Sequence, residues 1–181
     1  SGSDRILKRM NRGHGRESYF AVIEKLRAAR PDLALSSDFI VGFPGETETD
    51  FEATMDLIRR VNFAQAYSFK YSPRPGTPAA AHEDQIDPAT MADRLERLQT
   101  LLNEQQLAFN AGMAGREIQV LFDRLGRKPG QIIGRSPWLQ ATHVDVGDAA
   151  ASLLGQVRLV RIERGAPNGV IGTLAGLGAA A

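Results

Sequence analysis

The residues that could do chemistry in this sequence are concentrated where a predicted strand runs into a predicted helix. Residues 36–55 read SSDFIVGFPGETETDFEATM, an apolar run that ends in glycines and a proline and is followed by acidic residues. Gly42 and Gly45 have no Cβ, so the backbone there can approach a ligand closely. The start of the following helix offers free N–H groups and a positive dipole end. Taken alone, this pattern predicts either an ordinary turn or one wall of a cofactor site.

Two further stretches are candidates for contact with a ligand or partner. YSPRPGTPA, residues 71–79, follows the next predicted strand and should emerge at the same rim as GFPGE. Arg74 lies there between two prolines on a stiff loop, which suits an arginine that meets a phosphate. A rigid connecting loop whose arginine is simply exposed to solvent explains the same pattern. Residues 1–3, Ser-Gly-Ser, form the third candidate and are too few to interpret alone.

The composition excludes several kinds of site within these 181 residues. There is no cysteine, so disulfides, thiolate nucleophiles and a cysteine-held cluster are excluded. The three histidines, His14, His82 and His143, lie too far apart in sequence for a helical metal pair, and no metal site is predicted. Because the sequence shows neither an apolar stretch of the ~20 residues that cross a bilayer nor a signal peptide, we expect a cytoplasmic protein with no membrane partner.

Alternating helix and strand patterns predict an α/β first domain. The strands expected over residues 33–41 and 66–71 are separated by a helix, which implies a parallel sheet. Asp87-Pro88 begins a long helix whose apolar stripe indicates core packing. The rest of the chain consists of five short alternating runs between Gly, Pro and Asn, which predicts a small all-β barrel. We place the domains at residues 1–114 and 115–181.

Basic residues interleaved with one aromatic distinguish the predicted barrel. Residues 115–181 contain eight Lys and Arg against five Asp and Glu, whereas residues 1–114 contain 14 against 16. Small OB-like barrels bind single-stranded nucleic acid with such a mixture of charge and stacking surface, although a solvated face explains a mild excess equally. The lone tryptophan could also belong to the core. The candidate RNA-binding residues are Arg74, Arg127, Lys128, Arg135, Trp138 and Arg158.

Read together and in this order, three stretches resemble the radical-SAM methylthiotransferases: SGSDRILKRMNRGH, SSDFIVGFPGETETDF and FKYSPRPGTPAA. Within that family the sequence is most similar to enzymes that add a methylthio group to C2 of N6-isopentenyladenosine next to the tRNA anticodon. The resemblance covers nearly the whole chain, from Ser1 to about Leu174. It implies an α/β fold, with the C-terminal part of a radical-SAM, TIM-like barrel over residues 1–114. It also implies a small all-β, OB-like TRAM domain that binds RNA over residues 115–181.

The resemblance also implies which residues line a cofactor. Family members use S-adenosylmethionine and iron–sulfur clusters, and the residues matching the cofactor-lining stretches are Ser1, Gly2, Ser3, Asp38, Ile40, Gly42, Phe43 and Gly45. The family's CxxxCxxC cysteines are absent, so no catalytic residue and no metal ligand is implied in this chain. Glu46 is displaced by one position from the family's GxIxGxxE pattern. The chain is therefore expected to be inactive alone and a transferase only within a longer parent, which acts on tRNA and needs a reductant for its clusters.

Several alternatives remain open at this point. Arg74 favours an RNA substrate, because relatives that modify a ribosomal protein usually have acidic residues there. A relative specific for threonylcarbamoyl-adenosine tRNA shares that arginine, whereas SSDF and the NEQQ of the long helix favour the isopentenyladenosine enzymes. The chain could instead work alone as an RNA-binding module, or be an α/β protein whose glycines only make turns. A partial barrel would also expose a strand edge that must be covered.

Overall fold

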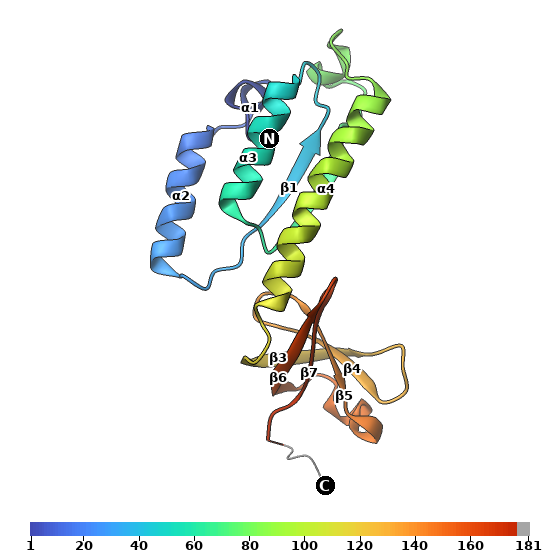
Figure 1. The fold of residues 1–181 in the computed structure, drawn as a ribbon. Coiled ribbons are helices and arrows are strands. Elements are labelled where there is room, and N and C mark those ends of the chain that lie inside the picture. Colours follow the sequence, from blue (N-terminus) through green and yellow to red (C-terminus); the bar gives the residue numbers. More distant parts are fainter. Residues whose placement is uncertain (177–181) are drawn as a thin grey trace. The chain divides into compact units, whose positions relative to one another are not determined.

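The structure, a computed structural model, describes residues 1–176 in two compact units, the first of which is Ser1–Gln105 (Figure 1). Residues 177–181, the end of the second predicted domain, lie outside the described residues. The division between the units falls inside the long helix α4, Pro88–Ala111. The predicted domain boundary, after residue 114, lies shortly beyond the end of this helix.

The first unit alternates helices and strands as the sequence predicts. β1 and β2 run parallel, with Ser36 opposite Gln65 and Val41 opposite Lys70. Among residues 1–176 these two strands form a sheet of their own, so the second edge of β1 has no partner strand there. The elements in chain order are α1 (Asp4–Arg9), α2 (Arg16–Ala29), β1 (Ser36–Val41), α3 (Glu48–Val61), β2 (Gln65–Lys70), the 3-10 helix η1 (Pro78–Ala81) and α4.

Local hydrogen bonds explain where these elements begin. β1 starts at Ser36 rather than at residue 33, because Leu33 N–H is used in a turn and donates to Arg30 O (3.1 Å). Thr47 is the N-cap of α3: its hydroxyl accepts from Asp50 N–H, and its own N–H donates to the Asp50 carboxylate (2.9 Å). This exchange is the capping box that the sequence predicts. Helix α3 therefore begins directly behind the GFPGE turn.

The three longer helices cover one face of the β1–β2 sheet. Phe39 and Val41 of β1 enter a core with Phe20, Ile23, Phe51, Met55, Leu57, Ile58, Val61, Phe63, Leu98 and Leu102. Because side chains alternate along a strand, Asp38 and Ile40 lie on the other face, in register with Tyr67 and Phe69. Tyr67 and Phe69 are 56% and 54% exposed. We call Asp38, Ile40, Tyr67 and Phe69 the open face.

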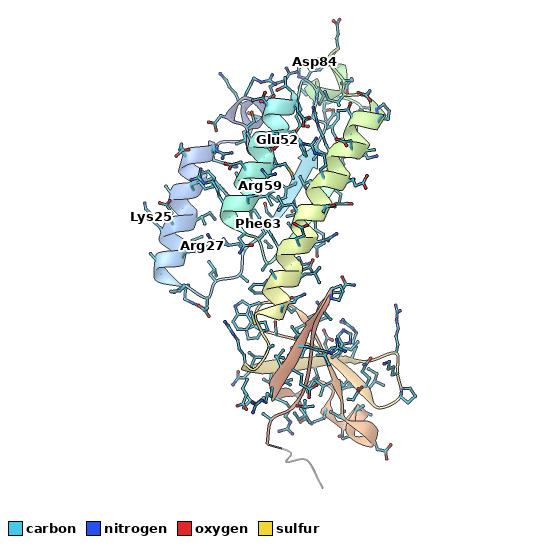
Figure 2. The ribbon with its side chains drawn as sticks, in the orientation of Figure 1. Lys25, Arg27, Glu52, Arg59, Phe63 and Asp84 are labelled. Carbon is cyan, nitrogen blue, oxygen red and sulfur yellow. The ribbon has the colours of Figure 1, made fainter. Side chains whose placement is uncertain are left out.

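Polar contacts join the helices at the exposed sides of this unit. Arg27 on α2 donates to Val61 O at the end of α3, and Glu52 on α3 accepts from Arg97 on α4. Figure 2 labels Arg27 and Glu52 on these two helices. Asp84, in the loop before α4, pairs with Arg9 of α1 (2.9 Å). Exposed pairs of this kind contribute little to stability individually. The apolar core is therefore the main source of stability in this unit.

The second unit is a closed five-stranded barrel, as the sequence predicts. Its strands are β3 (Glu117–Leu125), β4 (Gln131–Arg135), β5 (Ala141–Asp145), β6 (Val157–Ala166) and β7 (Gly169–Leu174), in the spatial order β3-β4-β5-β7-β6. Neighbours are antiparallel except β5 and β7, which run parallel. Two short 3-10 helices, η2 (Gly147–Ala149) and η3 (Ala151–Leu153), precede β6. Inward side chains such as Val120, Phe122 and Ile132 fill the barrel. Within residues 1–176, no helix has both the length and the apolar character that a membrane span requires.

Candidate functional site

The GFPGE turn follows β1 and depends on its two glycines. Gly42 and Gly45 have φ of 72° and 76°, in the left-handed region that other residues rarely adopt. The close approaches at these glycines are made by the protein itself. A Cβ on Gly42 would lie 2.2 Å from Met91 Cγ, and a Cβ on Gly45 would lie 2.3 Å from Asp84 Oδ2. The positive φ therefore favours glycine at both positions, and the atoms that an added Cβ would meet belong to side chains of the same chain, which can move.

Glu46 is turned inward and is fully engaged. Its side chain is 1% exposed and accepts hydrogen bonds from Gly42 N–H (2.7 Å) and from Arg94 Nη1 (2.9 Å). Arg94 Nη1 also donates to Glu46 O (3.0 Å). Burial raises the pKa of Glu46, while the Gly42 N–H and the Arg94 guanidinium oppose this rise. Glu46 is thus a partner of helix α4 and of the end of its own strand through Oε2.

The sequence pattern did not single out Arg94 as a residue of this site, although the pattern contains a signal of its burial. It lies on α4 three residues after Met91 and four before Leu98, on the stripe that predicts core packing. An arginine on the buried face of a helix requires a buried acceptor, because an unpaired charge is costly there. The sequence contains many acidic residues, so the partner could not be chosen from the pattern alone.

The SGS segment lies against the first turns of α3. Gly2 N–H donates to Thr54 Oγ1 (2.8 Å), and Ser3 Oγ donates to Asp50 Oδ1 (2.6 Å). Ser3 also caps α1 by accepting from Ile6 N–H. A Cβ on Gly2 would lie 2.4 Å from Ala53 O, so only glycine fits against this helix. Gly2 and Ser3 are buried, and the structure directs them at α3.

Asp50 joins the SGS segment and α1 to the stretch that contains the GFPGE turn. Its carboxylate accepts from Ser3, from Thr47 and from Arg5, whose Nη2 also donates to Gly45 O (2.6 Å). Burial acts to raise the pKa of Asp50, but the hydrogen bonds from Arg5, Ser3 and Thr47 outweigh it and hold the pKa well below the usual range. The capping box predicted the Thr47 contact, whereas the contacts with α1 depend on the fold.

The Asp50→Asn variant is expected to lose an acid-sensitive part of the stability. The folded pKa lies below the ~3.9 of an unfolded aspartate, so the unfolded chain takes up this proton at the higher pH. The contribution is therefore complete above about pH 5 and is lost as the pH falls below about 4. Urea unfolding of both proteins between neutral pH and about pH 3.5 should show a difference that shrinks on acidification. A difference that does not change with pH would contradict this role.

A cavity of about 290 Å³ lies along β1 and brings together three of the predicted cofactor residues, Ser1, Asp38 and Ile40. The lining includes the consecutive residues 37–40, so the cavity follows the edge of the strand rather than one face. Arg12, His14, Arg16 and Tyr19 line the other side. Gly2, Ser3, Gly42, Phe43 and Gly45 do not line this cavity. The eight predicted cofactor-lining residues therefore lie in three places: at the edge of β1, in the SGS segment and in the GFPGE turn.

The rim beyond the two strands carries an aromatic pair. Phe43 and Tyr71 follow β1 and β2, and their rings meet edge to face with centroids 5.2 Å apart. The Tyr71 hydroxyl is buried without a hydrogen-bond partner in the structure. A buried unpartnered hydroxyl is unfavourable unless a ligand or water completes it. Arg74 is exposed on the next loop, where its carbonyl accepts from Thr77 N–H (3.2 Å) and Thr77 Oγ1 (2.8 Å).

The barrel separates its predicted RNA-binding residues. Arg127 and Lys128 are exposed in the loop before β4, whereas Arg135 ends that strand and Trp138 follows it. Trp138 is partly buried against the barrel core, which limits its surface for stacking. Arg158 is exposed on β6 and donates to Gln156 Oε1 (2.5 Å). The two ends of β4 therefore carry distinct basic groups.

The loop after β4 contains an exposed residue that was missed in the sequence. Leu139 is 69% exposed at φ 63°, a conformation that is strained for leucine. Its carbonyl accepts from Arg135 Nη1 (3.1 Å). The next residue, Gln140, is buried and donates to Asn110 Oδ1 (2.6 Å). The loop is thus held rigidly while it presents an apolar side chain to solvent, and no local sequence signal marks this conformation.

Comparison with known proteins adds a family context to this geometry. A model of the radical SAM superfamily matches residues 1–58, from the SGS segment into α3. The tRNA-2-methylthio-N(6)-dimethylallyladenosine synthase of Maricaulis maris (strain MCS10) is 57% identical over 176 residues, which are 97% of this chain and 38% of that protein. Synthases of the same name are 58% identical in Sphingopyxis alaskensis, over 93% of this chain and 37% of that protein, and 59% identical in Erythrobacter litoralis, over 96% and 38%. The chain spans less than two fifths of these relatives' length.

Proposed function

We propose that the chain belongs to the radical-SAM methylthiotransferase family and is part of a tRNA-2-methylthio-N(6)-dimethylallyladenosine synthase. The parent adds a methylthio group to C2 of N6-isopentenyladenosine beside the anticodon. The observation that carries the proposal is the identity of 57–59% over nearly the whole chain to three synthases of that name. Because its proposed substrate is transfer RNA and its clusters need a reductant, we expect the parent protein to be cytoplasmic.

The residues at the rim and on the open face fit the adenosine part of S-adenosylmethionine. The orphaned Tyr71 hydroxyl could complete a hydrogen bond to a polar edge of the ligand. Asp38 is exposed on the open face, and a carboxylate there suits ribose hydroxyls, which donate hydrogen bonds. Ile40, Tyr67 and Phe69 offer apolar surface for a base. When bound, S-adenosylmethionine supplies the methyl group and the radical that removes hydrogen from C2.

The residues present do not fit an iron–sulfur cluster. The chain contains no cysteine, and no group of three or more His, Asp or Glu residues within residues 1–176 could hold a metal ion. The cluster ligands therefore belong to the rest of the parent, and this chain contributes a cofactor wall and RNA contacts. The unpartnered edge of β1 is where the parent barrel would continue.

The barrel is proposed to be a TRAM domain that contacts tRNA through its basic loops. Phosphate contacts release counterions, so the affinity should fall steeply as salt is raised. Fluorescence anisotropy with an anticodon stem–loop RNA should show binding that the Arg127→Gln/Lys128→Gln variant weakens roughly 3- to 10-fold at about 0.1 M salt, with a salt slope reduced by about one per lost contact. Arg30→Gln, which removes an exposed arginine paired with Asp32, serves as the control and should change neither quantity. Absence of binding at low salt would contradict the proposed RNA interface.

A further inference from the structure

Arg94 stands out because it is a charged side chain that is buried, with its guanidinium over the ring of the core residue Phe51. Among residues 1–176 it is the only basic side chain in the buried class, at 5% exposure. It lies on the core-facing side of α4, between Met91 and Leu98. A guanidinium at such a place loses its hydration and must recover the loss through specific hydrogen bonds.

All the polar contacts of Arg94 go to the segment that contains the GFPGE turn. Nη1 donates to Glu46 O (3.0 Å) and to Glu46 Oε2 (2.9 Å), while Nε donates to Glu48 Oε2 (3.4 Å). The same Oε2 of Glu46 accepts from Gly42 N–H (2.7 Å). Arg94 is thus linked through one carboxylate to Gly42, the residue directly after β1. Met91, one turn earlier on α4, fills the space beside Gly42.

This arrangement fixes the shape of the turn more than it stabilises the fold. A buried ion pair gives little net stability compared with well-packed apolar side chains, so its use here points to conformational specificity. Without donors from Arg94, Glu46 would gain by turning toward solvent, and Gly42 N–H would lose its acceptor. The turn contains two glycines in left-handed conformations, which gives the backbone many alternatives.

We propose that Arg94 is a positioning residue that holds the turn from Gly42 to Gly45 in the conformation that receives the adenosine part of S-adenosylmethionine. It acts through Glu46 and does not touch the ligand. This inference rests on the proposed function, because it needs the turn to be a wall of the cofactor site.

The test is the affinity of the parent synthase for S-adenosylmethionine, measured by equilibrium dialysis. Arg94→Lys keeps the charge but loses the Nε donor to Glu48 and the planar geometry of the guanidinium, and we expect it to weaken binding about 10-fold, or about 1.4 kcal/mol. Glu46→Gln keeps an acceptor for Gly42 N–H and should weaken binding by a smaller factor. The control is Arg97→Lys on the same helix, because Arg97 is 38% exposed, pairs with Glu48, Glu52 and Asp93, and lies over the ring of Phe51 rather than against the turn. The affinity for tRNA should be unchanged in all three variants.

The outcomes separate this inference from the function on which it rests. A parent that does not bind S-adenosylmethionine at all would overturn the proposed function. A normal parent whose Arg94→Lys and Glu46→Gln variants bind the cofactor within twofold of it would overturn only the positioning role. Loss of far-UV circular dichroism in both variants would also overturn it, since Arg94 would then serve the fold alone.

Discussion

Replacing Arg94 with Met is expected to lower the free energy of unfolding of the chain by about 3 kcal/mol, because it leaves Glu46 as a buried carboxylate without its cation. The side chains of this pair are 6% and 1% exposed, so water cannot take the place of the guanidinium without opening the turn. Urea unfolding followed by far-UV circular dichroism measures the change, since the long helices lie in or begin in the same unit.

Two companion variants show whether the loss comes from an unpaired charge. Adding Glu46→Gln to Arg94→Met removes that charge and should recover more than half of the lost stability, to within about 1 kcal/mol of the wild type. Arg97→Met removes partly exposed ion pairs and a contact with the Phe51 ring, and it should cost about 1 kcal/mol or less. If the double variant were as unstable as Arg94→Met, lost packing rather than the buried carboxylate would explain the result.

Gly2→Ala is expected to destabilise the chain by about 2 to 3 kcal/mol, because the added methyl meets backbone atoms that cannot move aside. The new Cβ would lie 2.4 Å from Ala53 O and 2.7 Å from Thr54 Cα. Both atoms belong to α3, so relief requires the SGS segment to move away from the helix and to lose the Gly2 N–H to Thr54 Oγ1 bond.

The matched control for Gly2 is Gly13→Ala, at a glycine whose added Cβ would have no heavy atom within 4 Å. Its thermal midpoint should stay within a degree or two of the wild type, whereas Gly2→Ala should unfold several degrees lower. Equal midpoints for the two variants would show that the SGS segment is not tightly held on α3. In that case the glycine at position 2 would need another explanation, such as close approach of a ligand.

The elements of the fold were predictable because their signals are local. The Thr47 capping box, the alternation along β3 to β7 and the Asp87-Pro88 start of α4 each depend on residues a few positions apart. The hydrogen bonds of Asp87 with Thr90 N–H (2.9 Å) and Thr90 Oγ1 (2.6 Å) confirm that last signal. The parallel pairing of β1 and β2 followed from the helix between them.

The contacts that shape the candidate site were not predictable, because they join residues far apart in sequence. Glu46 and Arg94 are separated by 48 positions, and Ser3 and Asp50 by 47. The sequence marked Gly42 and Gly45 as places of close approach, but it could not show that Met91 and Asp84 occupy that space. The strained Leu139 depends on the buried bond between Gln140 and Asn110, which also exists only in the folded chain.

The most direct test of the proposed function is a chimera in which residues 1–181 replace the matching region of the synthase that is 57% identical. The chimera is expressed in cells that lack the enzyme, and nucleosides from their tRNA are separated and identified by mass spectrometry. We predict that 2-methylthio-N6-dimethylallyladenosine returns, as it does with the unaltered relative. A chimera that folds and carries its clusters but leaves N6-dimethylallyladenosine unmodified would contradict the proposal.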